Sequence, residues 1–214
     1  MKLSKRLKTI VNLIEPEDII ADVGCDHAYL SIYLAKNDLC QGIIATEVAI
    51  GPYNIALQNI KDNNLEQKIK LYLTDGLNNI EENLNTIVIA GMGTSTIIDI
   101  LNNYDLSNVT KMIIQSNNNW IELRRFLNAI GYYIENEINT YENKKDYLTF
   151  LVKKSNRSNL KRELICGKFN SMNIEFYQRR ISKLELIKKR IPNKNDIKYK
   201  ELSVQINILK DYLS

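Results

Sequence analysis

One stretch of ten residues constrains the fold of this 214-residue chain more than any other. Residues 21–30 read ADVGCDHAYL; a short apolar run leads into them and a helical pattern of apolar residues follows. A strand that passes through a glycine-containing loop into a helix is the element with which open α/β sheets bind nucleotide-like ligands. The stretch therefore predicts such a sheet, with a ligand site where its first strand ends.

The charge of this loop indicates the kind of ligand. A dinucleotide-binding loop offers glycines and helix N–H groups to a diphosphate. Here Asp22 and Asp26 flank Gly24, so a diphosphate would be repelled. A ligand that carries an ammonium, a sulfonium and hydroxyl groups suits two carboxylates better. S-adenosylmethionine (SAM), with S-adenosylhomocysteine as its product, is such a ligand.

Apolar runs alternate with helical patterns along the first two thirds of the chain. The predicted strands are 18–23, 42–47, 68–74, 86–90 and 111–115, and the predicted helices include 2–14, a segment that ends near 37, one that starts at 51–52, one after 93, and 120–127. We expect Ile55, Ala56 and Ile60 to face inward on the third of these helices. On the fourth, we expect Ile97, Ile98 and Leu101 to face inward. This alternation predicts a parallel sheet with helices on both faces.

Two further strand-like runs, 132–138 and 147–153, are joined by the polar stretch 139–146. We expect them to form an antiparallel pair at the sheet edge. A parallel α/β sheet that ends in an antiparallel hairpin suits a Rossmann-like, class I SAM-dependent methyltransferase better than a dehydrogenase.

Strand patterns stop at about residue 156, and apolar residues then recur at steps of three and four. Ile191-Pro192-Asn193 interrupts this pattern, which predicts two helices in an antiparallel hairpin or short coiled coil. We therefore divide the chain into a Rossmann-like catalytic domain, 1–155, and a small all-α domain, 156–214.

Positive charge is concentrated in the last part of the chain. Residues 153–214 hold 16 Lys and Arg against 6 Asp and Glu, whereas residues 1–152 hold 13 against 19. This asymmetry indicates a polyanion-binding element on a catalytic body, although a solvated lysine-rich helix would show it too. The candidate RNA contacts are Lys5 and Arg6 on the first helix and the outward Arg179, Arg180, Lys183, Lys188, Lys189 and Arg190 on the hairpin.

Composition excludes several classes of protein. No apolar run reaches the roughly 18 residues of a membrane span, and the basic start lacks a cleavage site typical of a signal peptide. The three cysteines are far apart and form no CxxC pair, which argues against a disulfide framework and a zinc site. We expect a cytoplasmic monomer that needs no metal and has no membrane partner.

The polar residues converge at the carboxyl ends of the predicted strands, where open α/β sheets bind ligands. Glu47 lies 25 residues after Asp22, near the spacing at which a carboxylate accepts ribose hydroxyls. Asp75 could accept from the exocyclic amine of adenine, and Asp22 and Gly24 would face the amino-acid end of SAM. Taken singly, each acidic residue could be a helix cap or a turn former.

His27, the only histidine, lies beside Asp26 in the opening loop. A lone histidine is more often packed or capping than catalytic. Asp26, His27 and Tyr29 are nevertheless candidate catalytic residues, because they lie at the mouth of the predicted site. One of them could accept a hydrogen bond from a substrate amine, and another could stack on a base.

These motifs together resemble one family. ADVGCDHAYL, with LSKRL at 3–7, TDGL at 74–77, IAGMG at 89–93 and the helical hairpin, is similar to the TrmK family of bacterial tRNA (adenine-22-N1)-methyltransferases. The resemblance covers essentially the whole chain and implies SAM as cofactor and tRNA as partner. The SAM contacts that we assign with its help are Asp22, Gly24, Glu47, Val48, Asp75, Gly76, Ala90, Gly91 and Met92. It also implies a target-base role near Asp26, and substrate contacts at Gln115 and Asn117.

The residues support this chemistry on their own terms. Nitrogen 1 of adenine has a free lone pair, so alignment and stabilisation of the cationic product matter more than a strong base. Exocyclic-amine methyltransferases usually carry an Asn/Asp-Pro-Pro-aromatic run after the fourth strand, whereas residues 90–93 here read AGMG. The alternatives left open are an NAD-type oxidoreductase, a non-catalytic RNA-binding protein that keeps a SAM fold, and a methyltransferase for another tRNA position or ribosomal RNA.

Overall fold

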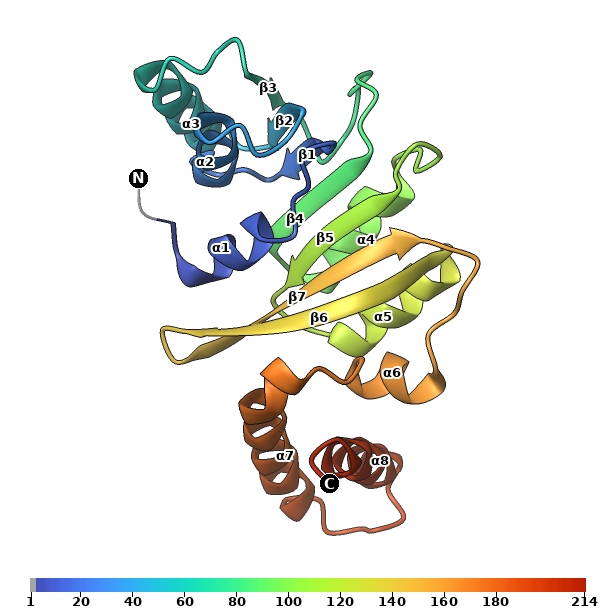
Figure 1. The fold of residues 1–214 in the computed structure, drawn as a ribbon. Helices are drawn as coiled ribbons and strands as arrows, with labels where there is room; N and C mark the ends of the chain where they lie inside the picture. The colour runs from blue at the N-terminus through green and yellow to red at the C-terminus, as the bar shows by residue number, and fades with distance from the viewer. Residues whose placement is uncertain (1–2) are drawn as a thin grey trace.

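The computed structural model describes residues 3–214 and shows a seven-stranded sheet with a helical hairpin beside it (Figure 1). The strands are β1 Ile19–Val23, β2 Gly42–Glu47, β3 Ile69–Leu73, β4 Thr86–Met92, β5 Lys111–Ser116, β6 Tyr132–Glu142 and β7 Lys145–Lys154. The sheet has the order β3-β2-β1-β4-β5-β7-β6. All five strands predicted in the first part of the chain are therefore confirmed, and β1 to β5 are parallel.

The two edge strands are antiparallel, as the sequence predicts, but longer than expected. β6 and β7 pair from Tyr132 opposite Lys154 up to Glu142 opposite Lys145. The polar stretch 139–146 is therefore mostly strand, and the turn consists of Asn143 and Lys144, both with positive φ. Because β7 runs against β5, this turn lies at the carboxyl edge of the parallel strands, on the same side as the loop after β1.

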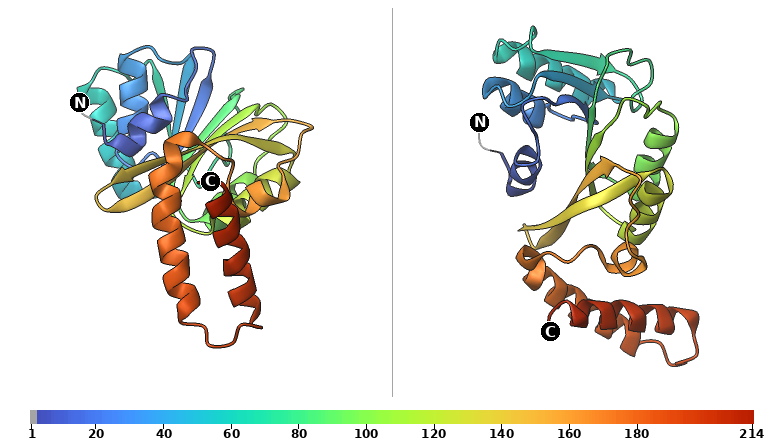
Figure 2. Two further views of the ribbon diagram at one scale, coloured as in Figure 1. Left: turned by 60° about the horizontal axis from the view of Figure 1, so that its bottom comes forward. Right: turned by 45° about the vertical axis from the view of Figure 1, so that its right-hand side comes forward.

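Helices cover both faces of the sheet (Figures 1 and 2). The helices of the sheet region are α1 Lys5–Val11, α2 Tyr29–Lys36, α3 Ile50–Asp62, α4 Thr94–Asn102 and α5 Trp120–Ala129. One apolar core lies between the sheet and α1, α2 and α3; the other lies between the sheet and α4 and α5. Helix α1 is shorter than the helix predicted over 2–14, and the first residue of that prediction, Lys2, lies outside the described residues.

Two predicted core positions are wrong. Ile55 is 43% exposed because the inward stripe of α3 passes through Ala56 and Ile60. On α4, Ile98 is only partly covered, whereas Ile100 and the predicted Ile97 are buried. In both helices the exposed or partly exposed isoleucine is the sequence neighbour of a buried residue, so apolar character alone does not show which of the two faces inward.

The C-terminal region consists of α6 Lys161–Cys166, a short 3₁₀ turn Ser171–Asn173, α7 Ile174–Lys189 and α8 Ile197–Asp211. The antiparallel hairpin of α7 and α8 is confirmed, whereas α6, with only six residues, was not predicted (Figure 2). Apolar residues of α7 and α8 belong to the same core as α5 and β6. No helix within residues 3–214 is long and apolar enough to cross a membrane.

Candidate active site

The loop between β1 and α2 has an unusual backbone. Gly24, Asp26 and Ala28 all have positive φ, so two side-chain-bearing residues adopt a left-handed conformation within five residues. The Cys25 N–H donates to the Thr46 carbonyl of β2 at 2.9 Å, which ties the loop to the neighbouring strand. A Cβ at Gly24 would overlap the methyl group of Met92 in β4. The glycine therefore leaves room for the Met92 side chain at the carboxyl edge.

Asp22 lies at the end of β1 and is 6% exposed. Its carboxylate accepts a hydrogen bond of 2.6 Å from the Ser31 hydroxyl of α2. Burial raises the pKa of Asp22 to about 6, against the lowering effect of the Ser31 hydrogen bonds. No cationic side chain of residues 3–214 lies within ion-pairing distance of Asp22. This carboxylate is thus placed to receive a cation from outside the chain.

Glu47, at the end of β2, is held by three backbone N–H groups. Its Oε1 accepts from Val48 and Ala49, each at 3.0 Å, and its Oε2 accepts from Asp26 at 3.0 Å. A carboxylate has about four lone-pair sites, so one position on Oε2 stays open for a ligand hydroxyl. The predicted acceptance of both ribose hydroxyls by Glu47 would require the Asp26 N–H to move away.

The predicted adenine side of the site carries apolar side chains that the protein leaves uncovered. Val48 is 64% exposed and Leu73, at the end of β3, is 48% exposed; they flank Glu47. Asp75 follows β3 in an exposed position, and Gly76 has a φ of +61°. Leu73 is not among the predicted site residues, because its apolar side chain fits the strand pattern of 68–74. An aromatic ring could cover this apolar surface while Asp75 accepts from its amine.

The third side of the site is the carboxyl end of β4. Ala90, Gly91 and Met92 form the end of this strand, with a register shift against β5, and Gly91 has a φ of +87°. The Asn117 side chain, in the loop after β5, donates to the Gly91 carbonyl at 2.6 Å. The structure thus brings the predicted residues after β4 and β5 into contact.

The three candidate catalytic residues lie together at the mouth. His27 Nε2 is 3.4 Å from the Asp26 carboxylate, whose side chain is 68% exposed. The His27 and Tyr29 rings are stacked, with centroids 5.4 Å apart. Asn59 of α3, which the sequence did not suggest, donates to the His27 carbonyl at 3.0 Å and fixes this segment. The mouth therefore presents an open carboxylate beside two stacked rings.

The predicted substrate residues near β5 are not all accessible. Gln115 is 1% exposed: it donates to the Thr149 hydroxyl at 2.8 Å and accepts from the Arg6 guanidinium at 3.3 Å. The prediction that Gln115 faces the substrate is wrong for this structure, because β7 and α1 cover its side chain. The Arg6 guanidinium also lies 5.8 Å from the ring centre of Tyr147, which the sequence predicts only as the start of a strand.

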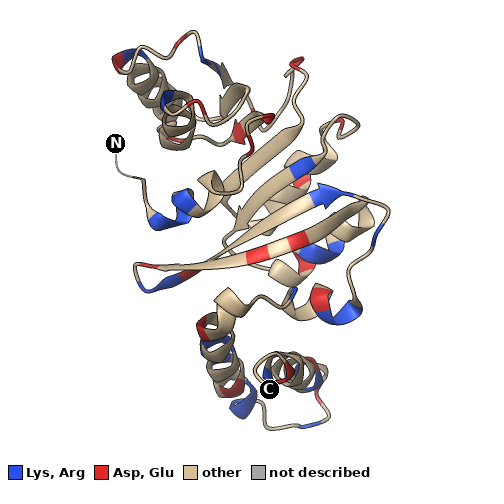
Figure 3. Cartoon of the chain, viewed as in Figure 1, with Lys and Arg blue, Asp and Glu red and all other residues tan. Residues whose placement is uncertain are grey.

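The hairpin carries most of the predicted RNA contacts, and Figure 3 shows Lys and Arg along it. Lys183, Lys189 and Arg190 are exposed, as predicted. Arg179 and Arg180 do not point outward: the first pairs with Asp146 of β7 at 2.6 Å, and the second lies over the Trp120 ring at 5.2 Å. Both arginines lie on the side of α7 that faces the sheet region. Lys188 lies over the Tyr199 ring at 4.6 Å.

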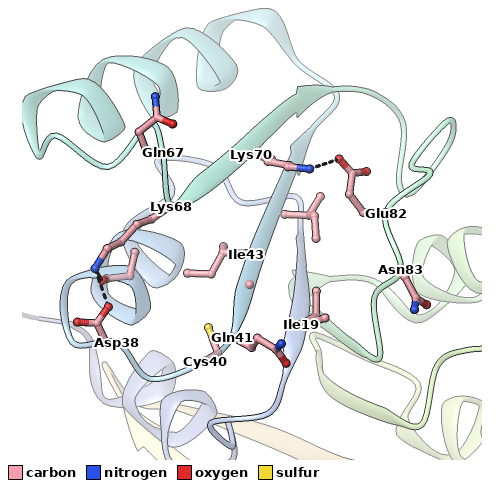
Figure 4. Close-up of a pocket in the computed structure, with 13 residues that line it drawn as sticks. Ile19, Asp38, Cys40, Gln41, Ile43, Gln67, Lys68, Lys70, Glu82 and Asn83 are labelled. Carbon is pink, nitrogen blue, oxygen red and sulfur yellow. Dashed lines mark hydrogen bonds and ion pairs between the residues drawn. The ribbon is translucent and has the colours of Figure 1, made fainter.

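A separate cavity of about 480 Å³ lies near the amino ends of β1, β2 and β3 (Figure 4). The ion pairs Lys68–Asp38 and Lys70–Glu82 flank it. None of the predicted site residues lines this cavity. Within residues 3–214, no group of three or more His, Cys, Asp and Glu side chains is arranged to hold a metal ion.

Comparison with known proteins identifies the class to which this fold and site belong. The family model described as a methyltransferase domain matches residues 3–150. Together with the strand order and the carboxylates after β1 and β2, it defines a class I, Rossmann-like methyltransferase with a helical C-terminal region.

Three relatives match over nearly their whole length. The Bacillus subtilis tRNA (adenine(22)-N(1))-methyltransferase is 28% identical, with 100% of this chain and 98% of the relative covered. The M. capricolum TrmK structure in complex with S-adenosyl-homocysteine is 33% identical, covers 100% and 98% of the two chains and has a TM-score of 0.85. A Streptococcus pneumoniae structure in complex with S-adenosyl-L-methionine is 31% identical, covers 100% of both chains and has a TM-score of 0.87. The chain belongs to the TrmK family of methyltransferases.

Proposed function

We propose that this chain is a SAM-dependent enzyme that methylates nitrogen 1 of the adenosine at position 22 of tRNA. The observation that carries the proposal is the pair of buried carboxylates, Asp22 and Glu47, at the carboxyl edge of a TrmK-family fold, where no cation from residues 3–214 meets them. A sulfonium and an ammonium would supply the missing positive charge.

The residues fit SAM in three parts. Asp22 and the backbone of Gly24 would hold the amino-acid end, and Glu47 would accept a ribose hydroxyl at its open Oε2 position. Val48, Leu73 and Asp75 would receive the adenine, with the apolar side chains against the ring. Gly76, Ala90, Gly91 and Met92 would complete the pocket. SAM supplies an electrophilic methyl group when it is bound.

The residues at the mouth would act on the acceptor. Nitrogen 1 attacks with its own lone pair, so the base must be aligned and the positive charge that develops on it must be stabilised. The exposed Asp26 carboxylate is placed to accept from the exocyclic amine of the adenine and to stabilise that charge. Tyr29, 46% exposed and stacked on His27, offers a surface for the unstacked base.

The hairpin would hold the tRNA backbone through its exposed cations, which include Lys183, Lys189 and Arg190. Lys5 and Arg6 lie at the start of α1, where their backbone N–H groups donate to the Glu142 carboxylate beside the β6–β7 turn. From this position their side chains would approach the RNA from the other side of the mouth. We propose further that the enzyme acts as a metal-independent cytoplasmic monomer. Binding should weaken as salt rises, because phosphate contacts release counterions.

The test is methyl transfer from labelled SAM to unmodified total tRNA, followed by nucleoside digestion and mapping of the product. We expect N1-methyladenosine at position 22. A different methylated nucleoside would place the activity on another acceptor. SAM binding without any transfer to RNA would favour the RNA-binding alternative that keeps a SAM fold.

The role of Asp26 needs its own variant. We expect Asp26→Asn to lower turnover by about tenfold or more while the SAM dissociation constant changes less than twofold, because the carboxylate acts on the acceptor. Single-turnover rates and calorimetric SAM titrations separate the two effects. Normal turnover would remove Asp26 from the chemistry.

A further inference from the structure

A groove of about 1300 Å³ lies between α5 and the helical hairpin. One wall comes from α5, the other from α7 and α8, and α6 contributes at one side. The right-hand view of Figure 2 shows the hairpin of α7 and α8 below the sheet. The groove is separate from the cavity at the amino ends of the strands. No residue that we assign to SAM lines it.

One end of the groove reaches the active-site edge. The loop residues 117–119 after β5 line the groove, and the Asn117 side chain is bonded to the Gly91 carbonyl of β4. Asn118 in turn accepts from the Thr94 N–H at the start of α4. A molecule that occupies the groove would therefore meet the loops that flank the SAM pocket.

The lining of the groove is largely apolar, and most of the charged residues in it are cationic. Five cationic side chains face two carboxylates, Glu122 and Glu201, and the second of these is paired with Lys198 at 3.6 Å. Arg125 of α5, Lys161 of α6 and Lys183 of α7 are exposed, and none has an ion-pair partner within residues 3–214. Three helices thus direct unneutralised cations toward one space, which favours an anionic occupant.

Arg180 adds a largely desolvated cation to the wall. Its guanidinium lies over the Trp120 ring and donates to the Gln205 side chain at 3.4 Å, and no carboxylate pairs with it within the described chain. Burial and the nearby Arg124 lower the pKa of Arg180. A guanidinium has five N–H donors, so most of this group's hydrogen-bonding capacity is left for a ligand.

We propose that this groove binds the phosphodiester backbone of the RNA strand next to the methyl-accepting adenosine. The inference rests on the proposed function, because that function supplies the polyanion and the reacting nucleotide. Phosphates would lie along Arg125, Lys161 and Lys183, and Arg180 would donate to them from its position over the Trp120 ring. The loop at 117–119 would then pass the strand over the carboxyl edge toward Asp26.

Two matched triple variants test this site. The groove variant is Arg125→Ala, Lys161→Ala and Lys183→Ala; the control variant is Lys36→Ala, Lys61→Ala and Arg157→Ala. Both remove two lysines and one arginine, and all six side chains are exposed. The probe is an unmodified tRNA transcript with adenosine at position 22, titrated at several salt concentrations.

We expect the groove variant to bind this tRNA about tenfold or more weakly and to flatten the log–log salt slope by about 2, as three lost phosphate contacts predict. The control variant should change the affinity twofold or less. Equal losses in both variants, or no loss in either, would overturn the proposal. Calorimetric SAM titration should give the same affinity for both variants as for the unaltered protein.

A further variant adds positive charge to the groove, so that the expected result is tighter binding, which a loss of folding cannot produce. Glu122→Lys adds a cation to the same groove on an exposed position of α5, and we expect it to tighten tRNA binding several-fold at low salt. Unchanged or weaker binding would count against the groove. If the unaltered protein binds but does not methylate this tRNA, the proposed function fails, while the comparison of variants still tests the groove.

Discussion

Acidic side chains are buried at both ends of the sheet, but their partners differ. At the amino end, Asp18 is 3% exposed and meets the Lys111 ammonium at 2.5 Å and the Thr86 hydroxyl at 2.8 Å. At the edge strand, Glu137 receives two parallel hydrogen bonds from Arg124, at 2.9 and 2.7 Å. In each place the chain supplies its own cation.

The carboxyl end is organised differently. Asp22 and Glu47 are almost as deeply buried, but they meet a hydroxyl and backbone N–H groups, and no cationic side chain of the described residues pairs with them. Burying a charge without a counter-charge costs stability unless a partner arrives. The paired carboxylates therefore stabilise the fold, whereas the unpaired ones are placed to bind a positively charged ligand.

The largest effect on stability should follow from breaking a buried ion pair. Arg124→Met leaves the Glu137 carboxylate buried without its partner, and we expect the free energy of unfolding to fall by about 3–5 kcal/mol. Chemical denaturation of the protein without ligand measures this change. The exposed pair Lys153–Glu135 supplies the control: Lys153→Met should cost less than about 1 kcal/mol.

A double variant sharpens this result. Arg124→Met with Glu137→Leu removes both charges, so it should recover most of the stability that the single variant loses. A double variant as unstable as Arg124→Met would show that packing around Gly167, whose added Cβ would approach both side chains, matters more than the charge.

The second prediction concerns an unpaired carboxylate. The pKa of Asp22 is about 6 in the folded protein and 3.8 in its ordinary state, so protonated Asp22 favours folding. This contribution is complete below pH 3.8 and is lost as the pH rises through 6. Asp22→Asn should therefore raise the free energy of unfolding at pH 8 by about 1–3 kcal/mol, with little gain at pH 3.5.

The same substitution should weaken SAM binding although it stabilises the protein. Opposite signs in these two measurements are the signature of a functional carboxylate, and denaturation curves beside calorimetric SAM titrations provide both. A variant that loses stability at pH 8 would place Asp22 among the structural carboxylates.

The third prediction is a pH dependence of SAM binding. If the ligand's positive charge requires ionised Asp22, affinity should fall about tenfold per pH unit below 6 and level off between 6.5 and 7.5. Calorimetry at pH 6 in buffers of different ionisation enthalpy should show that a proton is released on binding. Asp22→Asn should abolish both effects; a dependence that persists in this variant would come from another group.

Much of the site could be predicted because of sheet geometry. Parallel strands end at one edge, so the polar residues after β1, β2, β3 and β4 had to come together once the strands were recognised. The alternation of apolar runs was sufficient for that recognition. The loop after β1 supplied the charge that argued against a diphosphate.

Side-chain partners could not be predicted in the same way. Gln115 lies at the predicted edge, but its burial depends on Thr149 and Arg6, which are distant in sequence. Arg180 belongs to a hairpin rich in exposed cations, and only its contact with Trp120 reveals that it faces inward. Periodicity assigns a residue to a face of a helix, whereas tertiary contacts decide what that face meets.

Segments that are short or polar were also missed. α6 has six residues, too few for a helical period to emerge, and its N-terminus is capped by the Glu163 carboxylate, which accepts from the Leu160 N–H at 2.9 Å. The outer halves of β6 and β7 are polar because they pair with each other beyond the end of β5. A strand with no buried face at its tip lacks the alternation by which strands are recognised.

The smallest effect should come from Glu47→Gln, which tests how an unpaired carboxylate organises the site before any ligand arrives. Oε1 accepts two N–H groups, so we expect the amide oxygen to take that position and the amide nitrogen to face the Asp26 N–H. The loop at 24–28, which has three residues with positive φ, would lose this anchor. SAM affinity should fall about fivefold to tenfold, or about 1 kcal/mol, and hydrogen exchange at Asp26 should accelerate. Ile50→Ala is the control, since it alters an exposed side chain to which no ligand contact is assigned and leaves all three hydrogen bonds in place. Unchanged exchange at Asp26 in Glu47→Gln would mean that the strained loop is held by its contacts with Thr46 and Asn59 instead.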